Sequence, residues 1–472
     1  MGNTTQRFHK WFIGDAGATG VAQDKYTCGT LHYTPAALAT LFGWLLWGDV
    51  VFCLMEAMPG LLVMQLGDYE ISNQAKAALL TTIFTICNIL LNPVISYASD
   101  RHRGRWGRRR PFLLFTTPFV TLFLILIPWA PEIAAALMRH ESARAVLALC
   151  PVAPLVLTFG ILIACFQVFN MFTCTVYYYL VPDTVPEPLI GRFMGLFRVC
   201  GGVAALGFNW FLFGHAHAHM RLFFAVFGGL YGISFMLMCW KVREGGYPEI
   251  KEDHGHWYSP IRNYAGECFG SARNWVVFLI YGTMGWGSAA NIFFLYFYRD
   301  QIGLSETEYG RLGSIGLIIS LVLAAPMGAL VDRWGSYKSL IVGVIAVILC
   351  NLLCFVGIHG RLSAFVLVPM MSIPSGLLYI AVLKWMVDEY PRAQYGQWGS
   401  ASAIVGAAGV AVLSPLAGRL LDVFHNNYRM IYLFPAFFSS ISLVLIVILS
   451  RWPKSEPAEE SGMNLKSLSS AP

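Results

Sequence analysis

Charged residues are scarce in this chain. Only 12% of its 472 residues are Asp, Glu, Lys or Arg, whereas soluble globular proteins carry about 25%. Hydrophobic residues make up 57% of the chain, and the mean hydropathy is +0.59. This composition excludes an ordinary soluble domain and indicates a protein that crosses a membrane many times. The basic residues behind the net charge of +6 lie in short loops between apolar runs, so we expect a lipid bilayer and no nucleic acid as partner.

Recognisable catalytic and metal-binding patterns are also missing. No Cys or His spacing matches a zinc site, and most of the eleven cysteines lie inside apolar runs, where they suit small buried side chains. No Walker A sequence, nucleophile elbow or metal-binding helix occurs, so we expect no enzyme, no cofactor and no resident metal. His215, His217 and His219 alternate in one short loop, where solvation is favoured over metal binding because no Cys or acidic residue is adjacent.

Twelve apolar runs are long enough to cross a bilayer as helices, which takes about 20 residues each. The predicted helices occupy residues 37–65, 74–99, 111–130, 150–181, 193–214, 221–241, 275–299, 311–331, 339–359, 362–387, 395–421 and 430–450. The longest interior polar stretch divides them into six and six. The expected parts are a tail over 1–36, a first half over 37–241, an interdomain loop over 242–273, a second half over 274–451 and a disordered tail over 452–472.

Basic residues gather in the loops on one side of the expected helices. Six arginines lie between Arg101 and Arg110, Arg333 and Lys338 follow the eighth run, and further basic residues lie in 242–273. Loops rich in Lys and Arg stay on the cytoplasmic side of a membrane. The pattern predicts a multi-pass protein of the plasma (inner) membrane with both termini in the cytoplasm.

Two loop motifs occur once in each half. An Asp-Arg step, a Trp-Gly pair and a basic run appear at 100–112 and again at 328–338, and Asp, Pro and Gly keep one register in 181–193 and 386–398. This repetition indicates an all-α membrane protein whose twelve transmembrane helices form two pseudo-symmetric six-helix halves. Such duplicated folds move solutes by alternating access. Because each chain contains both halves, a monomer is expected to suffice.

The repeated loops resemble the signature of the major facilitator superfamily, with Gly328 in place and Ser96 where a glycine is usual. The run at 105–112 resembles the glycoside–pentoside–hexuronide:cation symporters, and is closest to their sucrose-transporter-like branch. Acidic residues at helix ends beside guanidinium groups can hold helices together through bonds that break when the halves move. For the arginine run, anchoring in lipid is an equal alternative. The expected gating residues are Asp100, Arg101, Arg108, Asp183, Arg192, Asp332, Arg333, Lys338 and Asp388.

The first run carries two acidic residues, Asp49 and Glu56, at a depth where ionisable groups are costly and usually functional. They are seven residues apart and share one helix face, with Trp44 and Trp47 near Asp49. A sugar ring can stack on an aromatic side chain while its hydroxyls donate to a carboxylate. In melibiose-permease-like members a helix I aspartate contacts sugar, and the resemblance gives Asp49 this role. Removal from water favours a protonated carboxyl group, so either acid can carry the coupled proton.

Departures from the sodium-coupled members favour a proton over sodium as the coupling ion. Those members carry two aspartates in the second helix, where this chain has Asn88 and Asn92, which bring no negative charge to balance a cation. The second sugar-binding acid of the family is also missing, because Cys174 stands near its position. The polar and aromatic groups available in that run are Gln167, Asn170, Tyr177 and Tyr178.

Polar residues in the other runs leave alternatives open. Arg198 and Lys384 can form structural ion pairs with the acids of the first run, and Asn291 can line a cavity or join two helices. The whole pattern predicts a secondary active transporter that moves a small molecule, a sugar or glycoside, together with a proton. The alternatives are a carrier of another solute (a lipid, nucleoside or drug) and a sensor that binds without transport, which the retained loop motifs disfavour.

Overall fold

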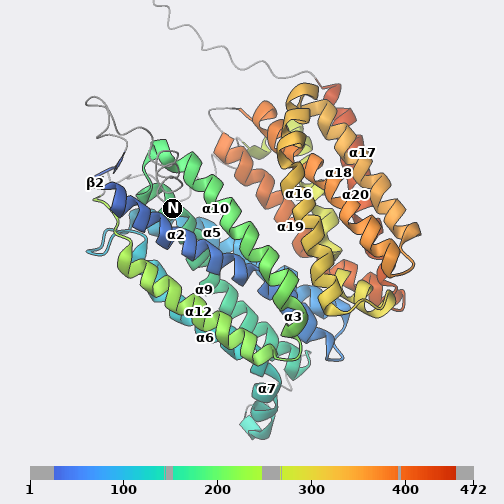
Figure 1. The fold of residues 1–472 in the computed structure, drawn as a ribbon. Coiled ribbons are helices and arrows are strands. Elements are labelled where there is room, and N and C mark those ends of the chain that lie inside the picture. The colour runs from blue at the N-terminus through green and yellow to red at the C-terminus, as the bar shows by residue number, and fades with distance from the viewer. Residues whose placement is uncertain are drawn as a thin grey trace, which may run out of the picture.

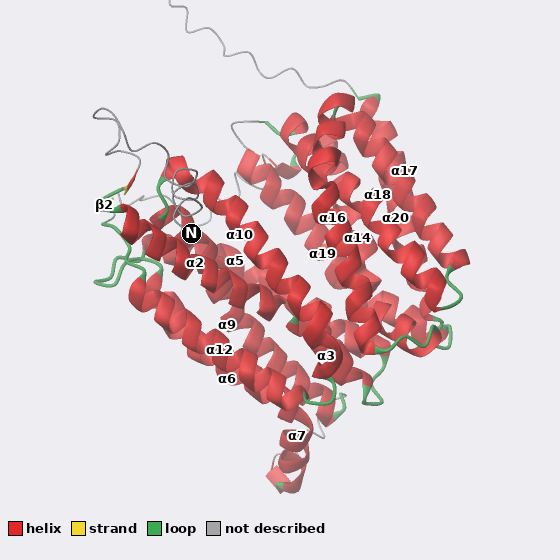
Figure 2. Ribbon diagram, in the orientation of Figure 1, coloured by secondary structure: helices red, strands yellow, loops and turns green. Residues whose placement is uncertain are grey.

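The computed structural model describes residues 26–142, 144, 152–246, 266, 268–391 and 395–452, and helices dominate this part of the chain (Figure 2). Within it, 12 helical spans are long and apolar enough to cross a membrane. Each predicted run overlaps one of these spans, which confirms the expected all-α membrane fold. The predicted tails fall mostly on 1–25 and 453–472, and most of the predicted interdomain loop falls on 247–265. These segments lie outside the described residues.

A short hairpin of β1 (Thr27–Cys28) and β2 (Leu31–His32) precedes the spans. Labels in η denote short 3₁₀ or π turns that continue a helix. The first six spans are α2 (Pro35–Glu56) with α3 (Met58–Gly67); α4 (Asn73–Ala77), η3 (Ala78–Thr82) and α5 (Ile83–Arg101); α6 (Arg110–Leu126), η4 (Ile127–Trp129) and α7 (Ala130–Arg139); α9 (Pro154–Thr184); α10 (Glu187–Gly207), η5 (Phe208–Leu212) and α11 (Phe213–Ala216); and α12 (Met220–Lys241).

The remaining spans follow the same scheme, and several are long single helices. They are α14 (Ala272–Trp286), η6 (Gly287–Phe293), α15 (Phe294–Tyr296) and η7 (Phe297–Gln301); α16 (Glu306–Trp334); α17 (Ser336–Gly357); α18 (Arg361–Glu389); α19 (Tyr395–Val423); and η9 (Tyr428–Tyr432) with α20 (Leu433–Ser450).

Local signals explain where the first span begins and why it is interrupted. The Thr34 hydroxyl accepts the backbone N–H of Ala37 at 3.2 Å, and Pro35 occupies the first helical position, where no N–H is needed. The span breaks at Ala57, because Pro59 in the first turn of α3 has no N–H to continue the ladder. The sequence predicted one uninterrupted run over 37–65, and the break places the end of α2 beside the central cavity.

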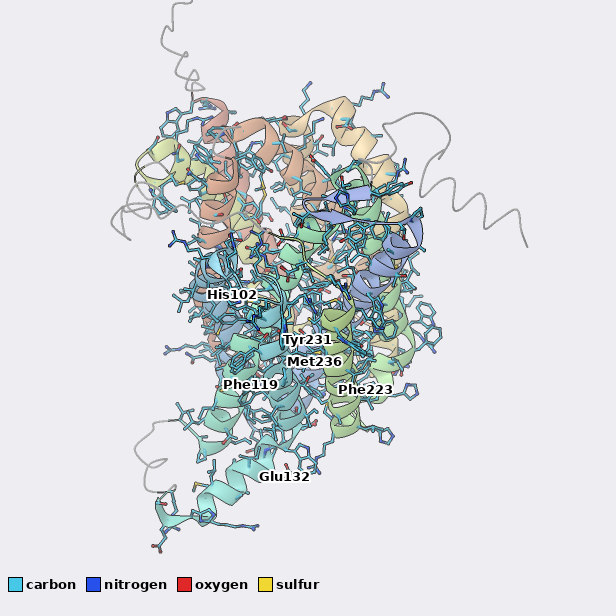
Figure 3. All side chains as sticks on the ribbon, turned by 90° about the vertical axis from the view of Figure 1, so that its left-hand side faces the viewer. His102, Phe119, Glu132, Phe223, Tyr231 and Met236 are labelled. Atoms are coloured by element: carbon cyan, nitrogen blue, oxygen red, sulfur yellow. The ribbon has the colours of Figure 1, made fainter. Side chains whose placement is uncertain are left out.

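The spans form two bundles. Figure 1 shows α2 to α12, in blue to green, in one bundle and α14 to α20, in yellow to red, in the other. Each bundle has buried apolar side chains of its own, and the larger cluster continues into the region where the bundles meet. Figure 3 shows Tyr231 and Met236 of α12 near Phe119 of α6 along the first bundle, with Glu132 of α7 at its far end.

Hydrogen bonds join the two bundles at the end remote from the β1–β2 hairpin. The Tyr296 hydroxyl donates to the Val63 carbonyl oxygen at 2.6 Å, and the backbone N–H of Asn73 donates to Asp422 at 3.0 Å. Towards the hairpin the ribbons of the bundles diverge (Figure 1). These hydrogen bonds hold the two bundles together at the end remote from the hairpin.

Candidate functional site

A cavity of about 1250 Å³ lies between the two bundles. Small-molecule sites in proteins usually measure about 300–1,000 Å³, so this space suits a solute with room for water. Both bundles supply its walls. The polar lining side chains from the first bundle are Glu56, Thr85, Asn88, Asn92, Gln167, Asn170, Thr175 and Tyr178, and those from the second are Tyr281, Ser288, Asn291, Asn351, Ser375, Tyr379 and Ser439.

Five of the residues predicted to bind substrate or to couple the proton line this cavity. They are Glu56 at the end of α2, Gln167, Asn170 and Tyr178 on α9, and Asn291 on η6. Glu56 is exposed there, and it is the one lining residue of the described chain with a formally charged side chain. The cavity therefore offers a single carboxylate among amides, hydroxyls and aromatic rings.

Asp49 lies two turns before Glu56 but inside the first bundle. It is 1% exposed, and the Cys53 thiol donates to its Oδ1 over 3.8 Å. Its Oδ2 has no hydrogen-bond partner within the described residues. Gly201 of α10 makes room for it, since a Cβ there would come within 3.0 Å of Oδ2. Asp49 thus faces α10, whereas Glu56 reaches the cavity.

The aromatic residues predicted to surround Asp49 do not line the cavity. Trp47 is 45% exposed and its indole N–H donates to the Ser234 hydroxyl on α12 at 3.0 Å, while Trp44 packs against the apolar cluster. The Tyr177 hydroxyl is buried and donates to the Leu45 carbonyl at 2.6 Å. Stacking surfaces of the cavity come instead from other rings, namely Phe52, Phe84, Phe166, Tyr178 and Phe294.

The two basic residues considered as partners of these acids lie elsewhere. Arg198 is exposed on α10, close enough to Cys53 to interact electrostatically, but within the described chain it forms no ion pair with Asp49 or Glu56. The Lys384 ammonium donates to Asp332 at 2.7 Å and so ties α18 to the end of α16. Neither Arg198 nor Lys384 belongs to the cavity lining.

The two asparagines of the second span hydrogen-bond to each other. The Asn92 amide donates to Asn88 Oδ1 at 2.8 Å, and the Thr175 hydroxyl donates to Asn92 Oδ1 at 2.6 Å. Asn351 of α17 was missed by the sequence reasoning, although a carboxamide inside a strongly apolar run was a usable signal. Gln167 and Asn351 are each 2% exposed, and their amide oxygens have no partner within the described chain.

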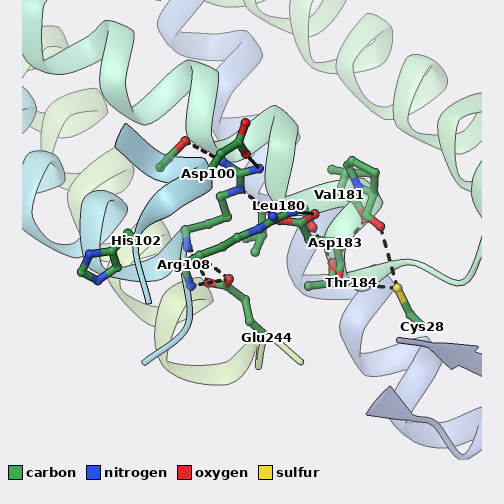
Figure 4. Close-up of polar contacts among 12 residues, drawn as sticks. Cys28, Asp100, His102, Arg108, Leu180, Val181, Asp183, Thr184 and Glu244 are labelled. Carbon is green, nitrogen blue, oxygen red and sulfur yellow. Dashed lines mark hydrogen bonds and ion pairs between the residues drawn. The ribbon is translucent and has the colours of Figure 1, made fainter. Parts of the chain in front are cut away.

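A network of ion pairs joins the ends of α5, α6 and α9 on the hairpin side (Figure 4). Arg108 bonds both oxygens of Asp183, at 2.9 and 2.5 Å. Arg109, only 4% exposed, bonds Asp183 at 3.0 Å, Asp100 at 2.5 Å and the Ser99 hydroxyl at 2.5 Å. The sequence singled out Asp100, Arg108 and Asp183, but missed Arg109, which links the two acids.

Glu244, beyond α12, completes this network. Its carboxylate accepts the backbone N–H groups of Arg108, Arg109 and Arg110 at 2.7–3.1 Å, and thereby caps the start of α6. Gly107, with φ of 98°, leaves room for this carboxylate. Beside the network, burial and the Asp183 carboxylate raise the pKa of the Cys28 thiol on the hairpin.

The second bundle has a smaller counterpart. Glu389 at the end of α18 is buried, pairs with Arg273 of α14 and accepts from the Tyr337 hydroxyl at 3.4 Å. Asp388, which the repeated motif singled out, is exposed beside it because adjacent helical residues face different directions. The other predicted gating residues Arg101, Arg192, Arg333 and Lys338 are exposed as well.

Comparisons with known proteins agree with this architecture. A fission yeast protein, the general alpha-glucoside permease of Schizosaccharomyces pombe, is 39% identical over 56 residues, which is 12% of this chain and 10% of that relative. The nucleoside transporter NupG has a TM-score of 0.66 at 14% identity over 88% of this chain and 100% of its own. A bacterial homologue of the iron transporter ferroportin, in an inward-facing state, has a TM-score of 0.64 at 14% identity, over 89% of this chain and 100% of its own.

At such identities the solved structures share the fold alone, and all of these similar proteins are transporters, which are not enzymes. The model of one family, described as MFS/sugar transport protein, matches residues 67–450. The match takes in most of both bundles and the greater part of the cavity lining. The chain therefore belongs to the MFS/sugar transport protein family, and is a multi-pass membrane transporter of the major facilitator superfamily.

Proposed function

We propose that this protein is a secondary active transporter that carries a neutral sugar or glycoside in symport with a proton. The observation that supports this most is the composition of the cavity, in which one carboxylate, Glu56, stands among carboxamides, hydroxyls and aromatic rings. Sugar hydroxyls both donate and accept hydrogen bonds, and the apolar face of a sugar ring packs on aromatic side chains. An anionic solute would meet no basic side chain among the described lining residues and would leave its charge uncompensated.

Acceptors from both bundles favour a solute held between them. The unpartnered oxygens of Gln167 on α9 and Asn351 on α17 are suited to accept from substrate hydroxyls. An unpaired buried acceptor costs about 1–3 kcal/mol, so a hydroxyl that reaches it is bound preferentially. Contact with both bundles is what alternating access requires, because the solute then responds to their relative movement.

Coupling to a proton is assigned to Glu56. Its carboxyl group lies in the cavity, where its protonation changes the hydrogen bonds that it can form with a bound solute. Asp49, by contrast, lies against Gly201 inside the bundle. Asn88 and Asn92 bond each other and supply no negative charge for a sodium ion. Asp49 remains the second candidate for proton binding, acting from within the first bundle.

The transport cycle follows from which end is closed. The basic loops support a hairpin end on the cytoplasmic side of the membrane. In that orientation the bonded end would face outward, and the conformation would open towards the cell interior. The ion pairs Arg108–Asp183 and Arg109–Asp100 tie helix ends on the hairpin side. Their rearrangement would accompany closure of that side.

A glycoside is favoured over other solutes by two observations. The run at 105–112 resembles the glycoside–pentoside–hexuronide symporters and their sucrose-transporter-like branch, and a curated relative with local similarity carries an alpha-glucoside permease name. The similarity to the nucleoside transporter is one of fold.

Uptake of labelled disaccharides and glycosides into proteoliposomes, under an imposed pH or sodium gradient, tests this proposal. We expect accumulation with the pH gradient. Glu56→Gln should abolish accumulation but keep exchange of labelled for unlabelled sugar, because it retains the polar contacts and loses the titrating group. Glu70→Gln, an exposed acid outside the cavity, is the matched control. Accumulation driven by sodium alone, or full accumulation by Glu56→Gln, would contradict the proposed coupling.

A further inference from the structure

A second cavity, of about 490 Å³, lies on the hairpin side of the first bundle, apart from the transport cavity. Two segments enclose it, namely the loop between α5 and α6 and residues 243–246 after α12. We call it the arginine pocket. Its long lining side chains are Arg103, Arg105, Trp106, Arg108, Arg110 and Arg243, together with Glu244.

Among the described residues that line the arginine pocket, Glu244 supplies the one carboxylate, and this carboxylate is already hydrogen-bonded. Glu244 accepts three backbone N–H groups at the start of α6, so its charge is directed at the helix end. The Arg108 guanidinium is bonded to Asp183, and Arg110 donates to the Cys239 carbonyl at 2.6 Å. Among the described lining residues, these bonds neutralise part of the positive charge and leave an excess of it.

Two guanidinium groups carry this excess. Arg105 and Arg243 are exposed, they come from the two different segments, and neither forms a hydrogen bond or ion pair with any other described residue. Like charges gathered in one concave site repel one another, and an anion placed between them relieves that repulsion. Guanidinium groups bind phosphate oxygens in pairs through parallel N–H bonds.

The pocket lies at the level where a membrane meets water. It adjoins the start of α6 at Arg110 and the end of α12 at Lys241. Trp106 is 62% exposed and Trp240 is 70% exposed, with the Lys241 ammonium 4.8 Å from the centre of the Trp240 ring. Exposed Trp beside Lys and Arg at helix ends is typical of the headgroup region of a bilayer.

We propose that the arginine pocket binds the phosphate of an anionic phospholipid headgroup in the leaflet on the hairpin side. The flanking tryptophans favour a lipid over a phosphate ion from solution, because they provide apolar surface for the glycerol and upper chain of a lipid. Basic pockets between membrane helices recognise anionic headgroups in this manner. The site is separate from the sugar cavity, and its occupation does not depend on which solute is carried.

Binding of defined lipids to the purified full-length protein in detergent tests the site. Native mass spectrometry counts retained phosphatidylglycerol, with phosphatidylcholine as the zwitterionic comparison and inorganic phosphate as the soluble competitor. We expect phosphatidylglycerol to be retained at about tenfold lower concentration than phosphatidylcholine. The double variant Arg105→Gln with Arg243→Gln should lose this preference. Arg451→Gln, an exposed arginine on the same side in the second bundle, should keep it.

Each outcome of the binding experiment tests the lipid site and does not depend on transport activity. Equal retention of both lipids by the wild type, or an unchanged preference in the double variant, would overturn the proposal. Release of the lipid by inorganic phosphate at a comparable concentration would overturn the lipid assignment. If the double variant were poorly folded, quenching of Trp106 fluorescence by brominated phosphatidylglycerol in the wild type, reduced in Trp106→Phe but unaffected in Trp275→Phe, supplies an independent measure.

Discussion

At the scale of single residues, Gln167 and Asn351 allow the effect of a polar group on stability to be separated from its effect on substrate binding. Each has a buried amide oxygen without a partner in the described chain, and each lines the transport cavity from a different bundle. Folding alone gives no reason for such groups, since a buried unpaired acceptor costs about 1–3 kcal/mol. Under the proposed function, a substrate hydroxyl that supplies the missing hydrogen bond would give that reason.

Replacement by leucine should therefore separate the two properties. In Gln167→Leu and Asn351→Leu we expect an unchanged or higher thermal midpoint, because an unpaired polar atom is removed at similar volume. The half-saturation concentration for sugar should rise about tenfold, which corresponds to the loss of one hydrogen bond. Scanning fluorimetry and proteoliposome uptake measure the two effects.

Ser339→Ala is the matched control for this pair of variants. Its hydroxyl is also buried and has no hydrogen-bond partner among the described residues, and it lies on α17 with Asn351 but outside the cavity. The control should leave half-saturation unchanged. Unaltered half-saturation in both leucine variants would remove these amides from the substrate site.

At the scale of an element, the start of α6 depends on a carboxylate from a distant segment. Glu244 bonds three N–H groups that the helix itself cannot satisfy. Glu244→Gln halves the acceptor capacity and removes the charge that complements the helix dipole. We expect a loss of about 1.5–3 kcal/mol in unfolding free energy, the range for hydrogen bonds to charged groups, with a matching fall in thermal midpoint.

Gly107→Ala should destabilise the same element for a steric reason. The residue has φ of 98°, and a Cβ would come within 2.6 Å of the Glu244 carboxyl carbon. A fall in thermal midpoint at least equal to that of Glu244→Gln is expected. Gly229→Ala on α12, where a Cβ meets nothing within 4 Å, is the control and should be neutral or stabilising. Equal midpoints for the two glycine variants would contradict the role given to Gly107.

The elements also show what sequence can and cannot provide. All twelve spans were predictable because a long apolar run has few alternatives in a bilayer. Glu56, Gln167 and Asn170 were identifiable because a polar side chain in an apolar run is costly to bury and therefore indicates a function. The different surroundings of Asp49 and Glu56 could not be predicted from the sequence, because both residues share one helix face. Tertiary packing puts Gly201 opposite Asp49 and the cavity opposite Glu56.

At the scale of the whole molecule, contacts between the bundles at the bonded end are expected to bias the equilibrium between conformations. Asp422 at the end of α19 accepts the backbone N–H groups of Asn73 and Gln74 at 3.0 and 3.2 Å, and so caps α4 across the two bundles. His217 similarly lies 3.0 Å from Asp68 and 2.9 Å from Glu306 of the other bundle. These bonds exist only while this end is closed.

Removing the cap should shift the molecule towards opening at this end. Asp422→Asn loses the charge that faces the start of α4, and we expect the open fraction to rise about tenfold, as for one charge-assisted hydrogen bond. Spin labels at positions 70 and 423, in a background without native cysteines, report the distance across this end. Glu308→Gln is the control, because its partner Arg361 belongs to the same bundle. If both variants gave the distance distribution of the parent, the bond from Asp422 would not bias the equilibrium. A longer distance in Asp422→Asn alone would show that capping of one bundle by the other keeps this end closed.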